Sequence, residues 1–441
     1  MDLTGTTAAI AALAVFLIAY GLVIAEEFTE MRKSKPMVIA AGLIWLLVAV
    51  AYAGREDLDV AAALRHNLLD YAEIMLFLLV AMTYVNTLAE RNMFNALRDW
   101  LIARGFGLPA LFWLTGAIAF PLSAVLDNLT TALVMGAVVI SVGAGNRAFI
   151  AIGCINVVVA ANAGGAFSPF GDITTLMVWQ AGRAQFWDFF HLFLPAFVNW
   201  FVPALLMSFA VPREHPSAKA VRTPPKPGGW IVTGLFAFTI VITVTGHNLL
   251  HLPPVIGMMT GLGLLQVYGY FIRRGERRME PETPDVPEGF RPASKPFDIF
   301  VSMKRVEWDT LMFFYGVVMC VGGLGALGYL AMLSNAMYAG LGATVANVMV
   351  GIVSAVVDNI PVMFAVLNMH PDLSLGQWLL VTLTAGVGGS LLSVGSAAGV
   401  ALMGQARGTY TFFSHLRWTW AIALGYAASI WTHLALNRAL F

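Results

Sequence analysis

The chain has 441 residues, of which 59% are hydrophobic and 11% are charged. A water-soluble chain of this length would need about a quarter charged residues, so the composition excludes an ordinary soluble protein and indicates helices that face lipid. The 25 basic and 25 acidic residues cancel, and this charge predicts no nucleic-acid partner. We therefore expect an all-α polytopic membrane protein in a lipid bilayer.

Ten segments have roughly the 20 mostly apolar residues that a spanning helix needs. They are 7–27, 37–54, 68–90, 147–181, 189–211, 229–249, 253–272, 308–331, 376–406 and 416–437. The first has no basic flank or cleavage site, so we expect it to remain as a span and not to be removed as a signal peptide. Cys154 and Cys320 lie inside apolar runs, which predicts small core residues and neither a disulfide nor a metal pair.

Charge and proline mark segments that we expect outside the bilayer. Residues 212–228 and 273–306 are rich in both, which predicts extramembrane loops. The segment from Asn92 to Arg104 has apolar residues at helical spacing, with Trp100 on the apolar face and Asp99 away from it. This pattern predicts an interfacial helix along the membrane surface.

A short motif recurs in the two halves of the chain. Ser-Ala-Val-x-Asp-Asn occupies residues 123–128 and again residues 354–359, each inside an apolar stretch (108–142 and 342–369) that polar residues interrupt. Glycine pairs then precede a possible helix break in each half. Interrupted apolar segments at corresponding places in two halves are typical of the binding sites of secondary transporters.

The distribution of basic residues predicts how the two halves are oriented. If 108–142 and 342–369 are re-entrant hairpins, every Lys and Arg falls in loops on one face except Arg55, Arg65, Arg183 and Arg438. The positive-inside rule then makes that face cytoplasmic, with both termini outside and the halves inverted. Hairpins that spanned fully would scatter the basic loops over both faces.

This assignment predicts the division of the chain into repeats. The predicted parts are an N-terminal extra helix and loop (1–36), a first repeat (37–211) with a hairpin (108–142) and a broken helix (147–181), a cytoplasmic linker (212–228), and a second repeat (229–441) with a cytoplasmic loop (273–306), a hairpin (342–369) and a broken helix (376–406).

The polar residues at the interruptions are candidates for an ion site. Asp127 and Asp358 lie at the two hairpin tips, where polar backbone at membrane depth must be buried in protein or line a water-filled cavity. Asp172 follows Pro169 and Gly171, which would unwind the helix and free its carbonyl groups. Carboxylate, hydroxyl and carbonyl oxygens suit hard cations such as Na⁺ and Li⁺. The alternative, in which these carboxylates cap helices without touching a substrate, stays open.

Glu73 is a separate candidate. It lies within the predicted span 68–90, where an ionised carboxylate is costly, so it is a possible proton relay. A helix-end acid near the outer interface is an equally good interpretation.

Three segments together resemble NhaD-type sodium/proton antiporters, which belong to an ion-transporter superfamily that also includes arsenite and dicarboxylate carriers. They are residues 127–131, 162–175 and 354–359. The resemblance runs from about residue 37 to the C-terminus. It implies exchange of Na⁺ or Li⁺ for H⁺ without an organic cofactor, in a homodimer of a bacterial inner membrane.

By position, the resemblance implies a set of ion and proton ligands. They are Asp127, Asn128, Thr130, Asn162, Asp172, Thr174, Thr175 and Asp358. Neighbouring oxygen donors extend the candidate site to Thr131, Ser168, Asn359, Ser393 and Ser396. Na⁺ is expected at Asp127, Asp172 and Asp358. The second tip departs from the first by having Pro361 in place of Thr130.

The leading hypothesis is therefore a cation/proton antiporter in which Na⁺ and protons compete for the same carboxylates. An anion carrier of the same superfamily (for arsenite, a dicarboxylate or sulfate, with or without Na⁺ coupling) is the alternative, because helix N-termini at the tips can bind anions. The predicted spans hold no Lys or Arg in the bilayer interior, while at least three acids meet at the tips, which favours a cation. An intramembrane aspartyl protease or a channel accounts less well for duplicated Asp-Asn tips and broken helices.

Overall fold

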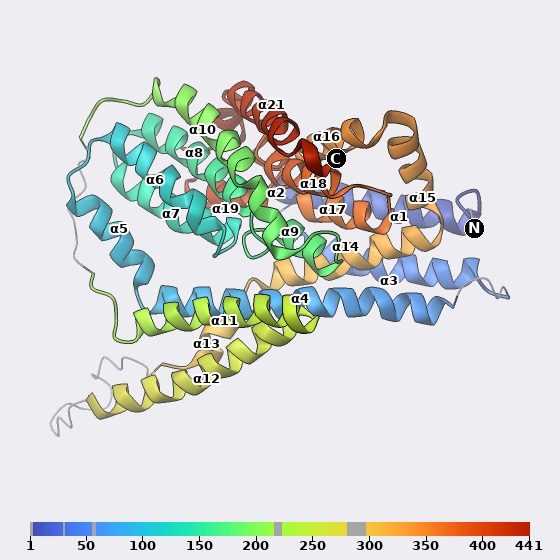
Figure 1. Cartoon of the computed structure of the whole chain (residues 1–441), viewed down its shortest axis with the longest axis horizontal. Coiled ribbons are helices and arrows are strands. Elements are labelled where there is room, and N and C mark those ends of the chain that lie inside the picture. The colour runs from blue at the N-terminus through green and yellow to red at the C-terminus, as the bar shows by residue number, and fades with distance from the viewer. Residues whose placement is uncertain (1–2, 30, 55–58, 216–222, 280–296) are drawn as a thin grey trace. The chain divides into compact units, whose positions relative to one another are not determined.

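The computed structural model describes residues 3–29, 31–54, 59–215, 223–279 and 297–441. Within these ranges the secondary structure consists of α-helices with a few short 3-10 and π segments (Figure 1). The helices form two compact units. The first comprises Met1–Ala72, Trp100–Ala220 and Trp308–Phe441, and the second comprises Glu73–Asp99 and Val221–Glu307.

The first unit contains most of the helices. They are α1 (Thr7–Ile24), α2 (Glu26–Thr29), α3 (Ser34–Ala51), α6 (Leu108–Ser123), α7 (Asn128–Val142), α8 (Arg147–Gly165), α9 (Ile173–Gln180), η1 (Phe186–Leu192), α10 (Phe193–Ser208), α14 (Trp308–Ala326), α15 (Tyr329–Ser334), η2 (Asn335–Ala339), α16 (Ala343–Ser354), α17 (Asn359–Asn368), α18 (Leu375–Gly388), α19 (Ala397–Gln405), α20 (Phe412–Leu416), α21 (Thr419–Leu436) and η3 (Arg438–Leu440). Helices α4 (Val60–Glu90) and α5 (Met93–Ala103) run from one unit into the other.

Helix α8 lies at the centre of the first unit. In its most apolar window 89% of the residues are buried, against 22% in α1, whose apolar side chains are therefore free to face lipid. Helices α6, α7 and α10 pack on α8, α16 packs on α18, and α3 packs between α1 and α14. The residues around the break after α8 consequently lie inside the unit, away from its surface.

Two short helix pairs interrupt this packing, and polar residues explain where each pair turns. Helices α6 and α7 are joined by residues 124–127, and Asp127 caps α7 by accepting a hydrogen bond from the Thr130 backbone N–H at 2.8 Å. Helices α16 and α17 are joined by residues 355–358, and Asp358 caps α17 by accepting from the Ile360 N–H at 3.4 Å. A side-chain oxygen at this position satisfies an N–H that the helix cannot.

Short non-helical breaks separate two further pairs of consecutive helices. Residues 166–172 separate α8 from α9, and Asp172 caps α9 in an extended conformation. Residues 389–396 separate α18 from α19, and Ser396 caps α19 in nearly the same conformation (φ −141°, ψ 147°, against −146° and 145° at Asp172). The segment before each break is almost fully buried.

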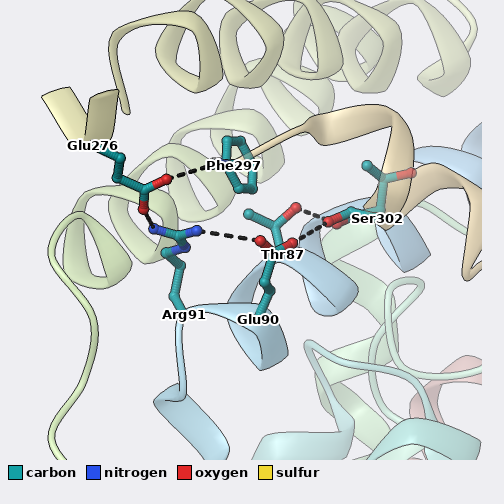
Figure 2. A network of polar contacts seen from close by, with 7 residues as sticks. Thr87, Glu90, Arg91, Glu276, Phe297 and Ser302 are labelled. Carbon is teal, nitrogen blue, oxygen red and sulfur yellow. Dashed lines mark hydrogen bonds and ion pairs between the residues drawn. The ribbon is translucent and has the colours of Figure 1, made fainter. Parts of the chain in front are cut away.

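The second unit is built from the later part of α4 with α11 (Gly229–Leu250), α12 (Pro254–Met279) and α13 (Ile299–Lys304). Arg91 directly follows α4 and is 2% exposed. Its guanidinium pairs with Glu276 at 2.7 Å and with Glu90 at 3.3 Å, and its central carbon lies 4.7 Å from the centre of the Phe297 ring (Figure 2). Because a buried charge must be paired, these contacts fix the end of α12 to the end of α4.

Most of the predicted spans correspond to helices, with differences in detail. Among the described residues eight helices are long and apolar enough to cross a membrane, and α6, α7, α16, α17 and α18 are shorter apolar helices. The chain is therefore an integral membrane protein of α-helices. Cys154 and Cys320 are buried and unbonded, as expected.

Part of the segment expected to be an extramembrane loop is helical. Residues 273–279 continue α12 and residues 299–304 form α13, where the sequence predicted one loop over 273–306. The charges that exclude these residues from lipid are compatible with helix, because Arg and Glu are good helix formers. The rest of that predicted loop, 280–296, lies outside the described residues, as do 216–222 of the predicted linker.

A helix, α5, is present where the sequence predicts an interfacial one, but its faces differ from the expectation. Asp99 is 6% exposed, and Trp100 is 48% exposed. The Asp99 carboxylate accepts hydrogen bonds from the Thr223 backbone N–H at 2.8 Å and from Arg98 at 3.1 Å. Burial alone would raise the pKa of Asp99, but these hydrogen bonds and the charge of Arg98 outweigh it and hold the pKa below its ordinary value. Asp99 thus anchors the segment that leads into α11.

Candidate ion-binding site

Asp172 connects the two short helix pairs. Its Oδ2 accepts a hydrogen bond from the Asn128 side chain at 3.1 Å and another from the Asn359 side chain at 3.0 Å. Its Oδ1 accepts from the Thr174 backbone N–H at 3.0 Å. Asn128 begins α7 and Asn359 begins α17, so one carboxylate oxygen joins two tips that are more than 200 residues apart in the chain.

Asn162 joins the two helix breaks. Its Oδ1 accepts from Asn128 at 3.2 Å, while its amide donates to the hydroxyls of Ser390 at 2.8 Å and Ser396 at 3.0 Å. Asn162 is fully buried in the last turns of α8, and both serines belong to the break after α18. A continuous polar network therefore connects both tips with both breaks. We call Asn128, Asn162, Asp172, Asn359 and Ser396 the central cluster.

The residues that follow Asp172 supply further oxygens. Thr175 donates its hydroxyl to the Asp172 carbonyl at 2.6 Å and to the Ser168 carbonyl at 2.8 Å. These contacts fix the backbone of the break. The Ser168 hydroxyl accepts from the Phe170 N–H at 3.3 Å. These two predicted residues therefore shape the site through the backbone.

Three predicted hydroxyls are buried without a hydrogen-bond partner among the described residues. They are those of Thr131, Thr174 and Ser393. A buried hydroxyl with no partner is costly, and a bound cation or water would supply the missing contact. The Thr174 hydroxyl and Asp172 Oδ2 lie 3.9 and 3.8 Å from the place where Gly386 would carry a Cβ, so the absence of a side chain on α18 leaves room beside them.

The two tip aspartates have different surroundings. Asp127 is half-buried and binds its own helix, accepting from the Thr130 hydroxyl as well as its N–H, both at 2.8 Å. Its φ of +54° is uncommon for a residue other than glycine, so the tip is held in a restricted conformation. The residue after it, Asn128, carries the link to Asp172. The predicted carboxylates at the tips therefore act here as helix caps, beside the central cluster.

Asp358 has a partner that the sequence did not suggest. Lys33, in the turn before α3, places its ammonium 3.5 Å from Asp358 Oδ2, and both side chains are more than four-fifths buried. Lys33 lies outside the predicted span 37–54, and its contact with Asp358 brings a basic side chain to one of the tip acids. The sequence does not reveal this contact, because Lys33 lies before the span and reaches the tip only in the folded chain.

Glycine allows the breaks to approach the tips. A Cβ on Gly164 would lie 1.9 Å from the Phe120 carbonyl oxygen, and one on Gly388 would lie 2.1 Å from that of Gly351. Each crossing brings a helix of a short pair against a broken helix, backbone to backbone. No other residue fits at these points without moving the main chain.

Glu73 belongs to the second unit, and its side chain is half-buried in α4. Its predicted role in proton transfer stays a prediction. His415 was not singled out from the sequence, yet it is fully buried, with one ring nitrogen 2.8 Å from the Ser390 carbonyl and the other 2.8 Å from the Tyr410 hydroxyl. It thereby supports the break that holds Ser390.

Comparisons with known proteins give a consistent result. A family model described as "Citrate transporter" matches residues 5–386. A protein of Alkalimonas amylolytica named Na(+)/H(+) antiporter NhaD is 56% identical, with all of this chain aligned to 93% of the relative. A protein of the same name from Vibrio cholerae is 55% identical over all of this chain and 94% of the relative. Sodium/proton antiporter 1 of Arabidopsis thaliana is 33% identical over 97% of this chain and 72% of the relative.

Proposed function

We infer the function from one premise: the chain belongs to the family of the NhaD sodium/proton antiporters. On this premise we propose that it exchanges Na⁺, or Li⁺, for H⁺ across a membrane. The names of the similar proteins support this exchange, and the central cluster supports it independently through the kinds of ligand that it gathers.

The observation that carries the proposal is the shared carboxylate of Asp172. A small hard cation prefers a carboxylate together with amide, hydroxyl and carbonyl oxygens. Around Asp172 are two tip amides and the buried hydroxyl of Thr174. Either asparagine can turn its amide to present oxygen in place of N–H, which would convert the hydrogen-bonded cluster into a cation site.

Exchange follows if the proton and the cation use the same oxygens. A proton on Asp172 removes the negative charge that attracts Na⁺, and a bound Na⁺ disfavours the proton by repulsion. Binding of one therefore releases the other. The proposed site is completed by Ser393 in the second break and by four residues of the two tips: Asp127, Thr130, Thr131 and Asp358.

We propose that the site moves by alternating access of two inverted repeats, residues 37–211 and 229–441, preceded by an extra helix (1–36) and joined by the linker 212–228. Repeated contacts support this division. Ser123 donates its hydroxyl to the Ala161 carbonyl at 2.6 Å, and Ser354 donates to the Ala385 carbonyl at 2.8 Å. In both halves a serine at the end of the first short helix thus binds the last turns of the broken helix. In this proposal the short pairs are re-entrant hairpins.

The orientation in the membrane rests on the basic residues. With re-entrant hairpins the loops rich in Lys and Arg all face one side, which the positive-inside rule makes cytoplasmic, and both termini lie outside. We propose a bacterial inner membrane, because several similar proteins are bacterial, and a homodimer, as the resemblance implies. Migration of the purified protein with a cross-linker would test the dimer.

Anion carriage is the second candidate function, since the family model that matches is described as a citrate transporter and Lys33 provides a cation beside the second tip. Against it, Lys33 is already paired with Asp358, and the central cluster contains an acid and no base. Helix N-termini could still attract an anion after cations had neutralised these acids.

Everted vesicles that report internal pH with a fluorescent dye test the proposal. For the wild-type chain, NaCl alone should trigger proton efflux at alkaline pH, and Asp172→Asn should abolish it. An anion carrier would respond when citrate is added and not to NaCl alone. Absence of a response to Na⁺ and Li⁺ at every pH would reject the antiport proposal.

A further inference from the structure

Lys33 contacts the second tip, and its charged side chain is mostly buried there. Its ammonium is 3.5 Å from Asp358 and 4.5 Å from the centre of the Phe313 ring, and Phe313 is fully buried in α14. Asp358 is followed directly by Asn359, which donates to Asp172. Lys33 therefore touches the residue next to the central cluster, and its cation occupies one oxygen of a proposed ion ligand.

The charge of Lys33 also acts on a second acid. Glu26, in α2, has its pKa raised by burial, and the charge of Lys33 opposes that increase while Asp309 adds to it. Asp309 itself accepts a hydrogen bond from the hydroxyl of Ser34, the residue after Lys33. A flexible four-carbon side chain between two acids can leave one and remain near the other. The contact with Asp358 is thus reversible in principle.

Lys35 provides the contrast. It carries the same charge two residues away in the chain, yet its side chain is exposed. An exposed lysine contributes little to electrostatics at a buried site, because water and salt screen it. The two lysines therefore separate an effect of local pairing from an effect of net charge.

We propose that Lys33 is a tethered competitor for the transported cation: its ammonium holds Asp358 in the empty site and must leave when Na⁺ or Li⁺ binds. This inference rests on the proposed function and adds a residue that sets cation affinity. Removal of the competing charge should tighten cation binding, because Asp358 then has no partner to give up.

The test measures the thermal unfolding midpoint of the purified protein in detergent against NaCl concentration. Choline chloride keeps the ionic strength constant, and pH is fixed. Lys33→Met retains the apolar stem over Phe313 and removes the charge, Lys33→Gln is the second neutral variant, Lys33→Arg retains the charge, and Lys35→Met is the matched control. Because binding is read from stability, the result does not depend on transport.

We expect the half-stabilising Na⁺ concentration to fall by about threefold to tenfold in Lys33→Met and Lys33→Gln, the range for a partly buried ion pair. Lys33→Arg and Lys35→Met should stay near wild type. Unchanged Na⁺ dependence in both neutral variants, or failure of both to fold, would overturn the proposal and leave the ion pair a structural role. A wild-type protein that Na⁺ does not stabilise more than choline would instead reject the proposed function.

Discussion

At the scale of single residues, helices pack closely around the site because glycine has no Cβ at the points where they cross. Gly164 and Gly388 face backbone carbonyl oxygens at the two crossings, where an added methyl group would come within 1.9 and 2.1 Å of oxygen. Gly165 and Gly389 repeat the pattern one residue later, where an added Cβ would lie 2.7 Å from the carbonyl oxygen of a glycine in the same break. A side chain could swing aside to make room, but a carbonyl group of a packed helix can do so only if the helix moves.

We therefore expect Gly164→Ala and Gly388→Ala each to lower the unfolding midpoint in detergent by about 1–3 °C, because overpacking of this kind costs about 1–3 kcal/mol. Gly42→Ala is the control, since Gly42 lies in α3 with no atom within 4 Å of the added Cβ. Its midpoint should not fall, because alanine is the better helix former. Equal midpoints for all three variants would contradict the close crossings.

A site residue was predictable from the sequence where its role depends on its neighbours along the chain. Asp172 followed from Pro169 and Gly171, since these break the helix whatever its neighbours are. Asn128 and Asn359 followed from the repeated motif. Lys33 and Ser390 were not predictable, because their importance comes from contacts across more than 200 residues of chain, and a lysine before an apolar span looks like an ordinary membrane-boundary residue.

At the scale of helices, the pattern of polar residues predicted the turns and breaks inside apolar stretches more accurately than it predicted where helices end. The turns at 124–127 and 355–358 fall inside the two stretches that the sequence marked as interrupted, and the breaks after α8 and α18 fall at the predicted glycine pairs. The end of α12 was placed seven residues too early, at 272, because apolar length measures what can lie in lipid and not what is helical. Beyond that point Arg91 and Glu276 hold the helix end in place.

The faces of α5 show the limit of amphipathic patterns. Helical spacing placed Trp100 with the apolar face and Asp99 away from it, yet Asp99 is the buried residue of the two. Its carboxylate is buried because a distant backbone N–H, that of Thr223, needs an acceptor. A pattern read within one helix cannot reveal a partner that lies more than 100 residues further along the chain.

At the scale of the whole molecule, the proposed function requires that the two halves be inverted in the membrane. Two tips that enter from opposite sides can meet at one carboxylate near mid-membrane, and each can then be opened to its own side in turn. The hydrogen bonds of Asn128 and Asn359 to the same oxygen of Asp172 agree with such a meeting point. Two tips entering from the same side could open to that side alone.

Labelling of single cysteines tests this topology. In a background with Cys154→Ala and Cys320→Ala, Arg213→Cys in the proposed cytoplasmic linker and Arg438→Cys near the C-terminus both lie at exposed positions. A membrane-impermeant maleimide should label Arg213→Cys in everted vesicles and Arg438→Cys in right-side-out vesicles. Labelling of both from the same side would contradict the proposed orientation, which places the linker and the C-terminus on opposite faces.

The most direct measurement of the central claim is proton release from the purified protein when Na⁺ is added in weakly buffered detergent solution. The comparison includes Asp172→Asn and, as a matched control, Asp372→Asn, which removes an exposed carboxylate outside the cluster. If Na⁺ and H⁺ share Asp172, wild type and Asp372→Asn should release protons on addition of NaCl but not of choline chloride, and Asp172→Asn should release none. Equal release from Asp172→Asn would show that the exchanged proton resides elsewhere and would contradict a shared site at this carboxylate.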